Sequence, residues 1–187
     1  MVAIAKDIKV PELRFPEFSG EWEEKRLGDV ANISKGKGLG KVDLDPNGIT
    51  ACIRYAELYT LYSEVISDVQ SRTSVNASEL VLSRGGEVII PASGESAIDI
   101  ATSSCVKDSG VALGGDLNII HSPYCGEFLA YMLSGHLNMK IASLAQGSSV
   151  MHLYPAQLKL LRMLTPSLPE QQKIAEFLTA VDEKIGK

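Results

Sequence analysis

The sequence has no long hydrophobic run. No stretch of its 187 residues approaches the roughly 18 consecutive apolar residues of a transmembrane helix. The N-terminal MVAIAKDIKV also lacks the long apolar segment of a signal peptide. We therefore expect a cytoplasmic chain without a membrane partner.

Cysteine is scarce as well. Cys52, Cys105 and Cys125 are odd in number, form no CxxC pair, and have no histidine at the spacing of a zinc site. The sequence thus predicts reduced, mostly buried cysteines, no metal site and no cofactor.

Nucleotide-binding motifs are missing. In KGKGLGK, residues 35–41, three residues separate Gly36 from Gly40, where a P-loop needs four, and Val42 stands where Ser or Thr is required. The segment remains interpretable as a flexible basic loop suited to a nucleic-acid backbone, or equally as a solvated hairpin tip.

Signatures of hydrolases are weak. PASGES, residues 91–96, resembles a nucleophile elbow only loosely, because Ile98 stands where the final glycine belongs. A serine or cysteine hydrolase acting through Ser96 or Cys105 is the least supported hypothesis.

Acidic residues are unevenly distributed in a chain of net charge −5. None occurs from Val30 to Val42 or from Phe128 to Pro169, and these windows carry Lys35, Lys37, Lys41, Lys140, Lys159 and Arg162. The windows could form one positive face on an acidic body. Alternatively, acids are absent because the windows are mostly core and turn, and composition does not separate the two.

Hydrophobic periodicity predicts an α+β domain with a compact mixed sheet. Strands are expected at 49–55, 80–83, 87–91, 117–121 and 160–164, with one long helix at 124–144 and a helical turn from Pro155. Residues 1–20 are expected to form an extended arm, held by Phe15, Phe18 and Trp22. We place the domain at 1–166 and a separate helical segment at 167–187.

The last segment predicts a helix from Leu168 to Ile185. Ser167 and Glu170 have the spacing of a capping box. Ile174, Leu178, Val181 and Ile185 repeat at intervals of four, three and four, as in the seam of a coiled coil. Packing on its own domain is favoured by the pattern alone, since a coiled coil needs three or more heptads.

Hydrogen-bond donors gather in AQGSSVMHLYPAQLK, residues 145–159. Ser148 and Ser149 can donate to phosphate oxygens, while His152 and Tyr154 can donate or stack.

Together these segments resemble the specificity (S) subunit of type I restriction-modification systems. The resemblance is carried by LRFPEFSGEWEEKRLGDV at 13–30, the KGKG that follows it, IRYAEL at 53–58, QGSSVMHLYPAQLKLL at 146–161 and LPEQQKIAEFLTAVDEKI at 168–185. LPEQQKIAEFL is the most specific of these motifs.

The resemblance implies one DNA target-recognition domain followed by the start of a long coiled-coil-type helix, about half of a usual S subunit. In that family two such domains each read one half of a split double-stranded DNA site, and their helices pair antiparallel as a spacer. Modification (methyltransferase) subunits methylate adenine using S-adenosylmethionine, restriction subunits use ATP, and the S subunit has no catalytic residues.

Candidate DNA-contacting residues follow from charge, loop placement and donor chemistry: Lys35, Lys37, Lys41, Arg54, Tyr55, Ser93, Ser148, Ser149, His152 and Tyr154. The candidate helix-pairing residues are Ile174, Leu178, Val181 and Ile185. A competing hypothesis is a scaffold that self-associates through its helix and reads no sequence.

Overall fold

The computed structural model describes residues 10–186 as a mixed α/β fold. The elements run in this order: β1 Glu23–Arg26, α1 Leu27–Val30, β2 Asn32–Lys35, η1 Lys41–Asp43, β3 Thr50–Ile53, α2 Glu57–Thr60, β4 Val65–Ile66, β5 Ser71–Thr73, η2 Ala77–Glu79, β6 Leu82–Arg84, β7 Glu87–Pro91, β8 Ser93–Gly94, η3 Asp99–Ala101, β9 Ser104–Val106, β10 Ser109–Leu113, β11 Leu117–His121, α3 Gly126–Tyr131, η4 Met132–His136, α4 Asn138–Leu144, β12 Met151–His152, α5 Pro155–Leu158, β13 Arg162–Thr165 and α6 Leu168–Ile185. The predicted α+β class is confirmed.

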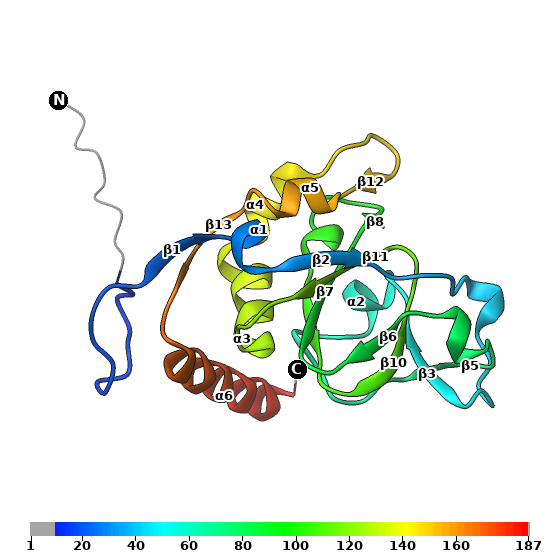
Figure 1. Cartoon of the computed structure of the whole chain (residues 1–187), viewed down its shortest axis with the longest axis horizontal. Coiled ribbons are helices and arrows are strands. Elements are labelled where there is room, and N and C mark those ends of the chain that lie inside the picture. Colours follow the sequence, from blue (N-terminus) through cyan, green and yellow to red (C-terminus); the bar gives the residue numbers. More distant parts are fainter. Residues whose placement is uncertain (1–9, 187) are drawn as a thin grey trace.

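A five-stranded sheet of order β2-β11-β7-β9-β4 lies at the centre (Figure 1). Side chains alternate between its two faces, so on β7 Val88 and Ile90 join one core while Ile89 joins another. All five residues of β7 are buried, as expected for a strand that is covered on both sides.

Different layers cover the two faces of this sheet. Helix α3 packs against β7 and β9 and lies between the sheet and α6. On the other face, the four-stranded sheet β5-β3-β10-β6 contributes Ile53, Val111 and Leu113 to the second core. The ends of β3, β10, β7 and β2 are thereby held at fixed positions.

The predicted helix at 124–144 is confirmed but interrupted. Between α3 and α4, η4 forms a π-helical turn in which Leu137 N donates to Met132 O at 3.0 Å. Ser134 Oγ accepts a hydrogen bond from Ser103 N and donates one to Ser103 O, both at 2.9 Å. This tertiary contact on the turn accounts for an interruption that periodicity alone does not reveal.

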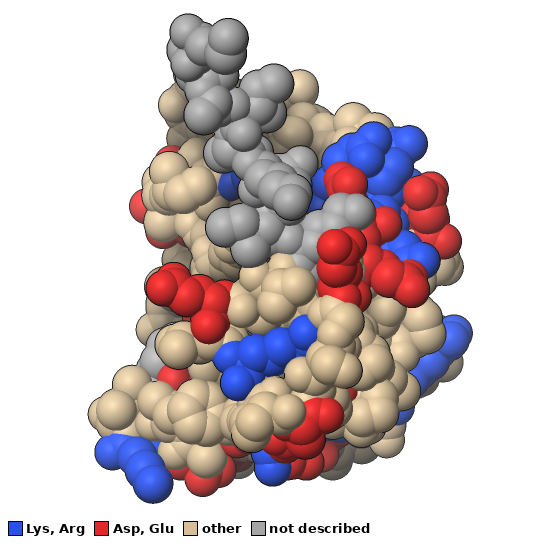
Figure 2. Space-filling view, turned by 90° about the vertical axis from the view of Figure 1, so that its left-hand side faces the viewer, with Lys and Arg blue, Asp and Glu red and all other residues tan. Residues whose placement is uncertain are grey.

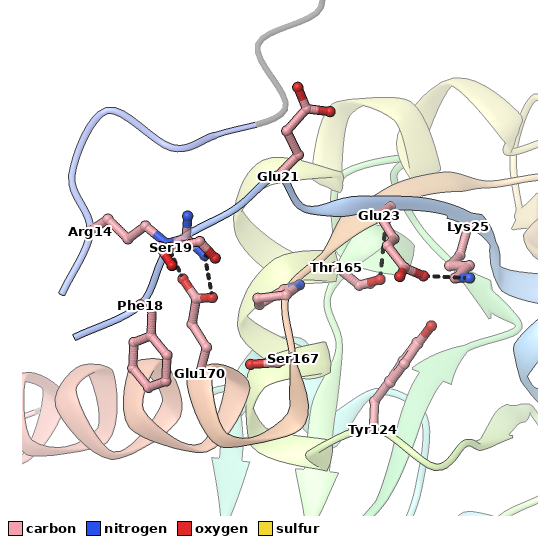
Figure 3. A pocket seen from close by; sticks show the side chains of 11 residues that line it. Arg14, Phe18, Ser19, Glu21, Glu23, Lys25, Tyr124, Thr165, Ser167 and Glu170 are labelled. Carbon is pink, nitrogen blue, oxygen red and sulfur yellow. Dashed lines mark hydrogen bonds and ion pairs between the residues drawn. The ribbon is translucent and has the colours of Figure 1, made fainter. Parts of the chain in front are cut away.

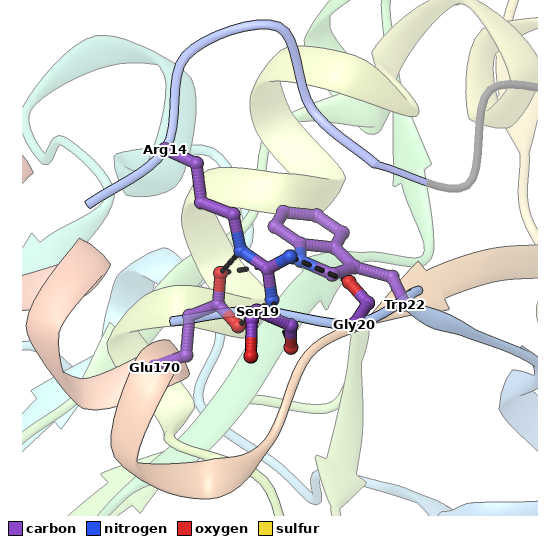
Figure 4. A network of polar contacts seen from close by, with 5 residues as sticks. All are labelled: Arg14, Ser19, Gly20, Trp22 and Glu170. Atoms are coloured by element: carbon purple, nitrogen blue, oxygen red, sulfur yellow. Dashed lines mark hydrogen bonds and ion pairs between the residues drawn. The ribbon is translucent and has the colours of Figure 1, made fainter. Parts of the chain in front are cut away.

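Helix α6 has the predicted bounds, but the predicted capping box is wrong. Ser167 stands at the N-cap position and makes no side-chain capping bond. The carboxylate of Glu170 instead receives Arg14 Nε and Arg14 Nη2, each at 2.7 Å, and Trp22 Nε1 at 3.2 Å (Figure 4). Charge-assisted bonds from a guanidinium are stronger than a bond to a backbone N–H, so the buried carboxylate turns toward the arm.

Two of the three aromatic residues expected to hold the N-terminal arm make ring contacts with the body of the domain. Phe15 packs edge-on against Phe177 of α6 at 5.8 Å between ring centroids, and Lys173 lies over the Phe15 ring. Trp22 packs in the same way against Phe128 at 6.3 Å. The predicted arm also includes residues 1–9, which lie outside the described residues.

A pocket of about 340 Å³ lies where the arm meets α6 (Figure 3). Phe18 and Glu170 line it, together with Tyr124 from the segment before α3. Arg14, the most buried basic residue that lines the pocket, already donates hydrogen bonds to Glu170 and to the carbonyls of Ser19 and Gly20 (Figure 4). We interpret the pocket as part of the contact that holds the arm.

The face that carries the arm has charges of both signs. Figure 2 shows lysine and arginine interspersed with aspartate and glutamate on this side of the molecule. Two ion pairs lie on the β1–β13 ribbon, Lys25 with Glu23 at 2.6 Å and Arg162 with Glu24 at 3.1 Å. Within residues 10–186, no helix combines the length and hydrophobicity needed to cross a membrane.

Candidate nucleic-acid interface

Several strands end at one side of the two larger sheets. Lys35, the last residue of β2, pairs with Asn118, and Leu117 pairs with Pro91 at the end of β7. Gly114 N donates to Ile53 O at 2.9 Å, and Ala92 N donates to Asp116 O at 2.7 Å. We call this surface, formed by residues 35–38, 53–54, 91–93 and 113–117, the strand-end edge.

A two-stranded ribbon extends the strand-end edge. In it β8 pairs with β12, so that Ser93 lies opposite His152, and Leu153 N donates to Ala92 O at 2.9 Å. The loop before β12 exposes Ser148 and Ser149. Five predicted DNA-contacting residues therefore lie on or beside this ribbon: Ser93, Ser148, Ser149, His152 and Tyr154.

These five side chains differ in how much surface they offer. Tyr154 is 48% exposed, and its ring stacks on that of His152 at 6.2 Å and 26°. Ser93 is only 8% exposed, so its hydroxyl offers the least surface.

The basic loop is not flexible in the way the sequence suggested. Gly36 N donates to Leu117 O at 3.1 Å, and Lys37 N donates to Leu113 O at 3.0 Å. A Cβ on Gly36 would lie 1.9 Å from Gly114 O, so only glycine allows this approach of the two backbones. The backbone N–H groups of these two residues are therefore not free to contact a nucleic-acid backbone.

What the loop presents is lysine ammonium groups. Lys35, Lys37 and Lys41 are exposed, and none makes an ion pair within the described part of the chain. Buried Leu39 anchors the loop between them. Lys35 and Lys37 are therefore held at the strand-end edge with their charges available, and Lys41 lies beyond it at the start of η1.

Arg54 and Tyr55 follow β3 at the strand-end edge but face different surroundings. Arg54 Nη2 lies 3.3 Å from Glu57 Oε1. Tyr55 is half-buried, packs against the second core, and tilts against Tyr59. Tyr55 therefore contributes to packing, whereas Arg54 keeps its guanidinium near the surface.

The acid-free windows do not make a uniformly positive face. Asp116 is exposed in the turn that receives the basic loop, and Glu95 is exposed directly after β8. Arg162 is paired with Glu24 on the β1–β13 ribbon. The edge carries both signs because segments outside the windows fold next to it.

Catalytic chemistry gains no support from the described residues. Ser96 Oγ accepts from Asp99 N and Ser96 N donates to Asp99 Oδ2, both at 3.1 Å, so this serine caps a short turn. Burial raises the pKa of Cys105 to about 12, which keeps it a thiol rather than a thiolate. All three cysteines are free, and residues 10–186 contain no cluster of three or more side chains that could hold a metal ion.

Of the predicted helix-pairing residues, Ile174 packs against the core of the domain, and the others become more exposed toward the end of α6. Gln171 and Ala175 are buried, whereas Ile174 and Leu178 are half-buried. Exposure then increases along the seam, from 37% at Val181 to 68% at Ile185. Packing on the domain uses one side of α6 and leaves an apolar strip beside it, which includes Phe177 at 55%.

Sequence reasoning missed the residues that support the edge. Glu57 holds Arg54, and the Gly114-Gly115 turn receives the basic loop. Two signals in the sequence pointed to them. Glu57 stands three residues after Arg54, and the apolar run before residue 114 ends in Gly-Gly.

The chain matches a known protein family over most of its length. The family model described as "Type I restriction modification DNA specificity domain" matches residues 19–187. No curated protein matches at a significant level.

Three solved structures have a similar fold. The chain is 18% identical to the type I restriction-modification S subunit from M. genitalium, with a TM-score of 0.67 over 94% of this chain and 42% of that one. The HsdS subunit from Thermoanaerobacter tengcongensis is 16% identical, with a TM-score of 0.61 over 95% of this chain and 40% of that one. A third structure, described as the basis of complex assembly and conformational transition of the type I R-M system, is 16% identical, with a TM-score of 0.65 over 91% of this chain and 41% of that one. The chain thus spans about 40% of the length of these chains.

Proposed function

The chain belongs to the family of type I restriction-modification DNA specificity domains, and from this premise we propose that it reads one half of a bipartite DNA target. In this family the domain supplies DNA specificity and not catalysis. We place the readout on the strand-end edge and the β8–β12 ribbon.

The observation that carries this assignment is the convergence of donors from distant segments. Lys37, Arg54 and the pair Ser149 and His152 come from three distant segments, which hydrogen bonds join at the strand-end edge and its ribbon. Exposed lysines suit phosphate contacts, which set position, while serine, histidine and arginine side chains can read base edges.

Binding by the isolated domain is expected to be weak and sensitive to salt. The strand-end edge carries few basic side chains that lack an ion-pair partner, and the acidic residues Asp116 and Glu95 lie next to them. In the proposed complex, modification subunits supply most phosphate contacts and methylate adenine, and restriction subunits cleave. The whole assembly would work in the cytoplasm, where its DNA target lies.

Methylation mapping tests the proposal. The domain, residues 1–166, is exchanged for that of a related specificity subunit, and the modified sequences are determined with the same modification subunits. One half of the methylated sequence should change while the other half stays the same. An unchanged methylated sequence would refute the proposed readout.

A helix-mediated scaffold is the second candidate function, and the exposed apolar strip on α6 favours it. Val181 and Ile185 remain exposed in the single chain. If the chain is only a scaffold, Leu178→Glu and Val181→Glu abolish self-association in sedimentation measurements, while Lys37→Ala and Ser149→Ala leave DNA binding unchanged. Loss of DNA binding in the latter variants would exclude a pure scaffold.

A further inference from the structure

Arg54 occupies a distinct position on the strand-end edge. A Cβ built on Gly114 would lie 3.5 Å from Arg54 Cα, and Gly115 N donates to Gly38 O at 2.8 Å. The arginine therefore emerges beside the basic loop, close to the groups that we assign to DNA contact.

Glu57 is fixed in place next to it. Glu57 is 6% exposed, and its Oε2 accepts the backbone N–H of Arg54 at 2.8 Å. Its Oε1 accepts Ser71 Oγ at 2.5 Å from β5 and Arg54 Nη2 at 3.3 Å. A carboxylate held by two other donors, the Arg54 backbone N–H and the Ser71 hydroxyl, offers the guanidinium one orientation.

The guanidinium is bonded on one edge and open on the other. Nη2 bonds Glu57, and the buried Nε lies on that same edge of the fork without a hydrogen-bond partner in residues 10–186. Nη1 neither belongs to the buried unpaired atoms nor bonds to another described residue. The Arg54 side chain is 23% exposed, so Nη1 and the second Nη2 hydrogen can meet an external acceptor.

We propose that Arg54 reads a guanine in the major groove and that Glu57 is the positioning residue that presents its guanidinium. The proposal rests on the proposed function, since it assigns one residue of the strand-end edge to one base. Guanine offers O6 and N7 as paired acceptors, which match two parallel donors of an arginine. A guanidinium already oriented by a buried carboxylate loses less side-chain freedom on binding.

Neighbouring cations have different roles. The ammonium groups of Lys35, Lys37 and Lys41 are exposed point charges on flexible stems, which suit phosphate. Arg72 lies on β5, which pairs with β3. Its Nε donates a hydrogen bond to Gly48 O at 2.6 Å, and its Nη2 donates one to Ile49 O at 2.8 Å. Arg72 is therefore bonded to backbone carbonyls and serves as a matched control.

Arg54→Lys is the sharpest test because it keeps the charge and removes the planar fork. The full chain is assembled with its modification subunits, and methylation is measured on sites carrying each base at every half-site position. Discrimination should fall roughly 5- to 150-fold at one guanine. The salt dependence of binding should stay unchanged, because no charge is lost.

Glu57→Gln should relax discrimination at the same position, by less than Arg54→Lys, because the amide keeps one acceptor but loses the charge. Arg72→Lys should leave discrimination unchanged at all positions. If Glu57→Gln does not fold, Ser71→Ala removes one of the bonds that hold the carboxylate and should relax the same position.

The proposal is overturned if Arg54→Lys lowers methylation equally on all sites, leaves it unchanged, or if the wild-type half-site specifies no guanine. These results leave the proposed function intact when domain exchange still changes the methylated sequence. A failed domain exchange would instead refute the proposed function.

Discussion

Glu170 is a charged residue that is only 1% exposed, and the N-terminal arm supplies its main partner. Replacing one partner of a buried ion pair leaves the other charge buried without a partner, which destabilises the fold. Replacing both partners with apolar residues leaves no buried charge. Arg14→Met should therefore lower the thermal unfolding temperature, and Arg14→Met with Glu170→Met should recover part of the loss. Scanning calorimetry checks this, and a double variant less stable than the single one would contradict it.

Lys107 and Glu127 form a second ion pair, between the turn after β9 and the first turn of α3. Burial raises the pKa of the Glu127 carboxyl, but hydrogen bonds from Lys107, the backbone and Cys125 outweigh it and leave the pKa below its usual value. The hydrogen bond that the Lys107 ammonium donates to Glu127 raises the pKa of Lys107.

A carboxyl with a lowered folded-state pKa stabilises the fold above its unfolded pKa, and this contribution is lost as the pH falls through the folded value. Lys107→Met should therefore reduce stability at pH 7 by less than about 1 kcal/mol, because the pair is partly exposed. The difference from wild type should shrink below about pH 4.5. Urea titrations at pH 7 and pH 3 measure this, and a difference that grows in acid would contradict the assignment.

At the scale of elements, α6 has two apolar surfaces with different roles. Ala175 is 4% exposed and packs in the core that also contains Val88 and Ile90, while Val181 faces outward. Ala175→Leu should cost about 1–3 kcal/mol through overpacking. Val181→Glu should change the free energy of unfolding by less than about 0.5 kcal/mol, as exposed substitutions usually do.

Urea unfolding at low protein concentration, where any association is minimal, checks this pair of variants. If Val181→Glu costs as much as Ala175→Leu, the outer strip is part of the domain core and is not free to pair with another helix.

Elements with a clear local pattern were the ones that sequence could predict. The residues of β7, β11 and α6 have apolar runs or a helical repeat, and their observed bounds match those predicted. In contrast, β8 and β12 have two residues each and exist because their distant segments pair. No local pattern encodes such a pairing, so the ribbon beside the strand-end edge could not be predicted.

The same limit applies to individual side chains. Ser148, Ser149 and His152 were predicted from donor chemistry, and the fold gathers them on one side. The partner of Glu170 could not be predicted, because a residue 156 positions away, Arg14, competes with the local cap. Tertiary contacts decide these cases, and spacing along the chain does not reveal them.

At the scale of the whole molecule, the distribution of charge predicts how DNA is held. Lys37 is exposed on the strand-end edge, whereas Arg162 is paired with Glu24 on the β1–β13 ribbon. Lys37→Ala should reduce the slope of log K against log salt by about 1, with equal loss on specific and non-specific DNA. Arg162→Ala should leave the slope unchanged, and fluorescence anisotropy over a salt series compares the two.

The proposed readout requires that DNA lies against the strand-end edge and its ribbon, and site-specific photo-cross-linking maps this contact. A photoreactive residue is placed in the full chain at Ser149, or at Asp108, which is exposed at the opposite end of β10. With the assembled complex and its target DNA, cross-links should form from position 149 and not from position 108. Cross-links from position 108 alone would contradict this account.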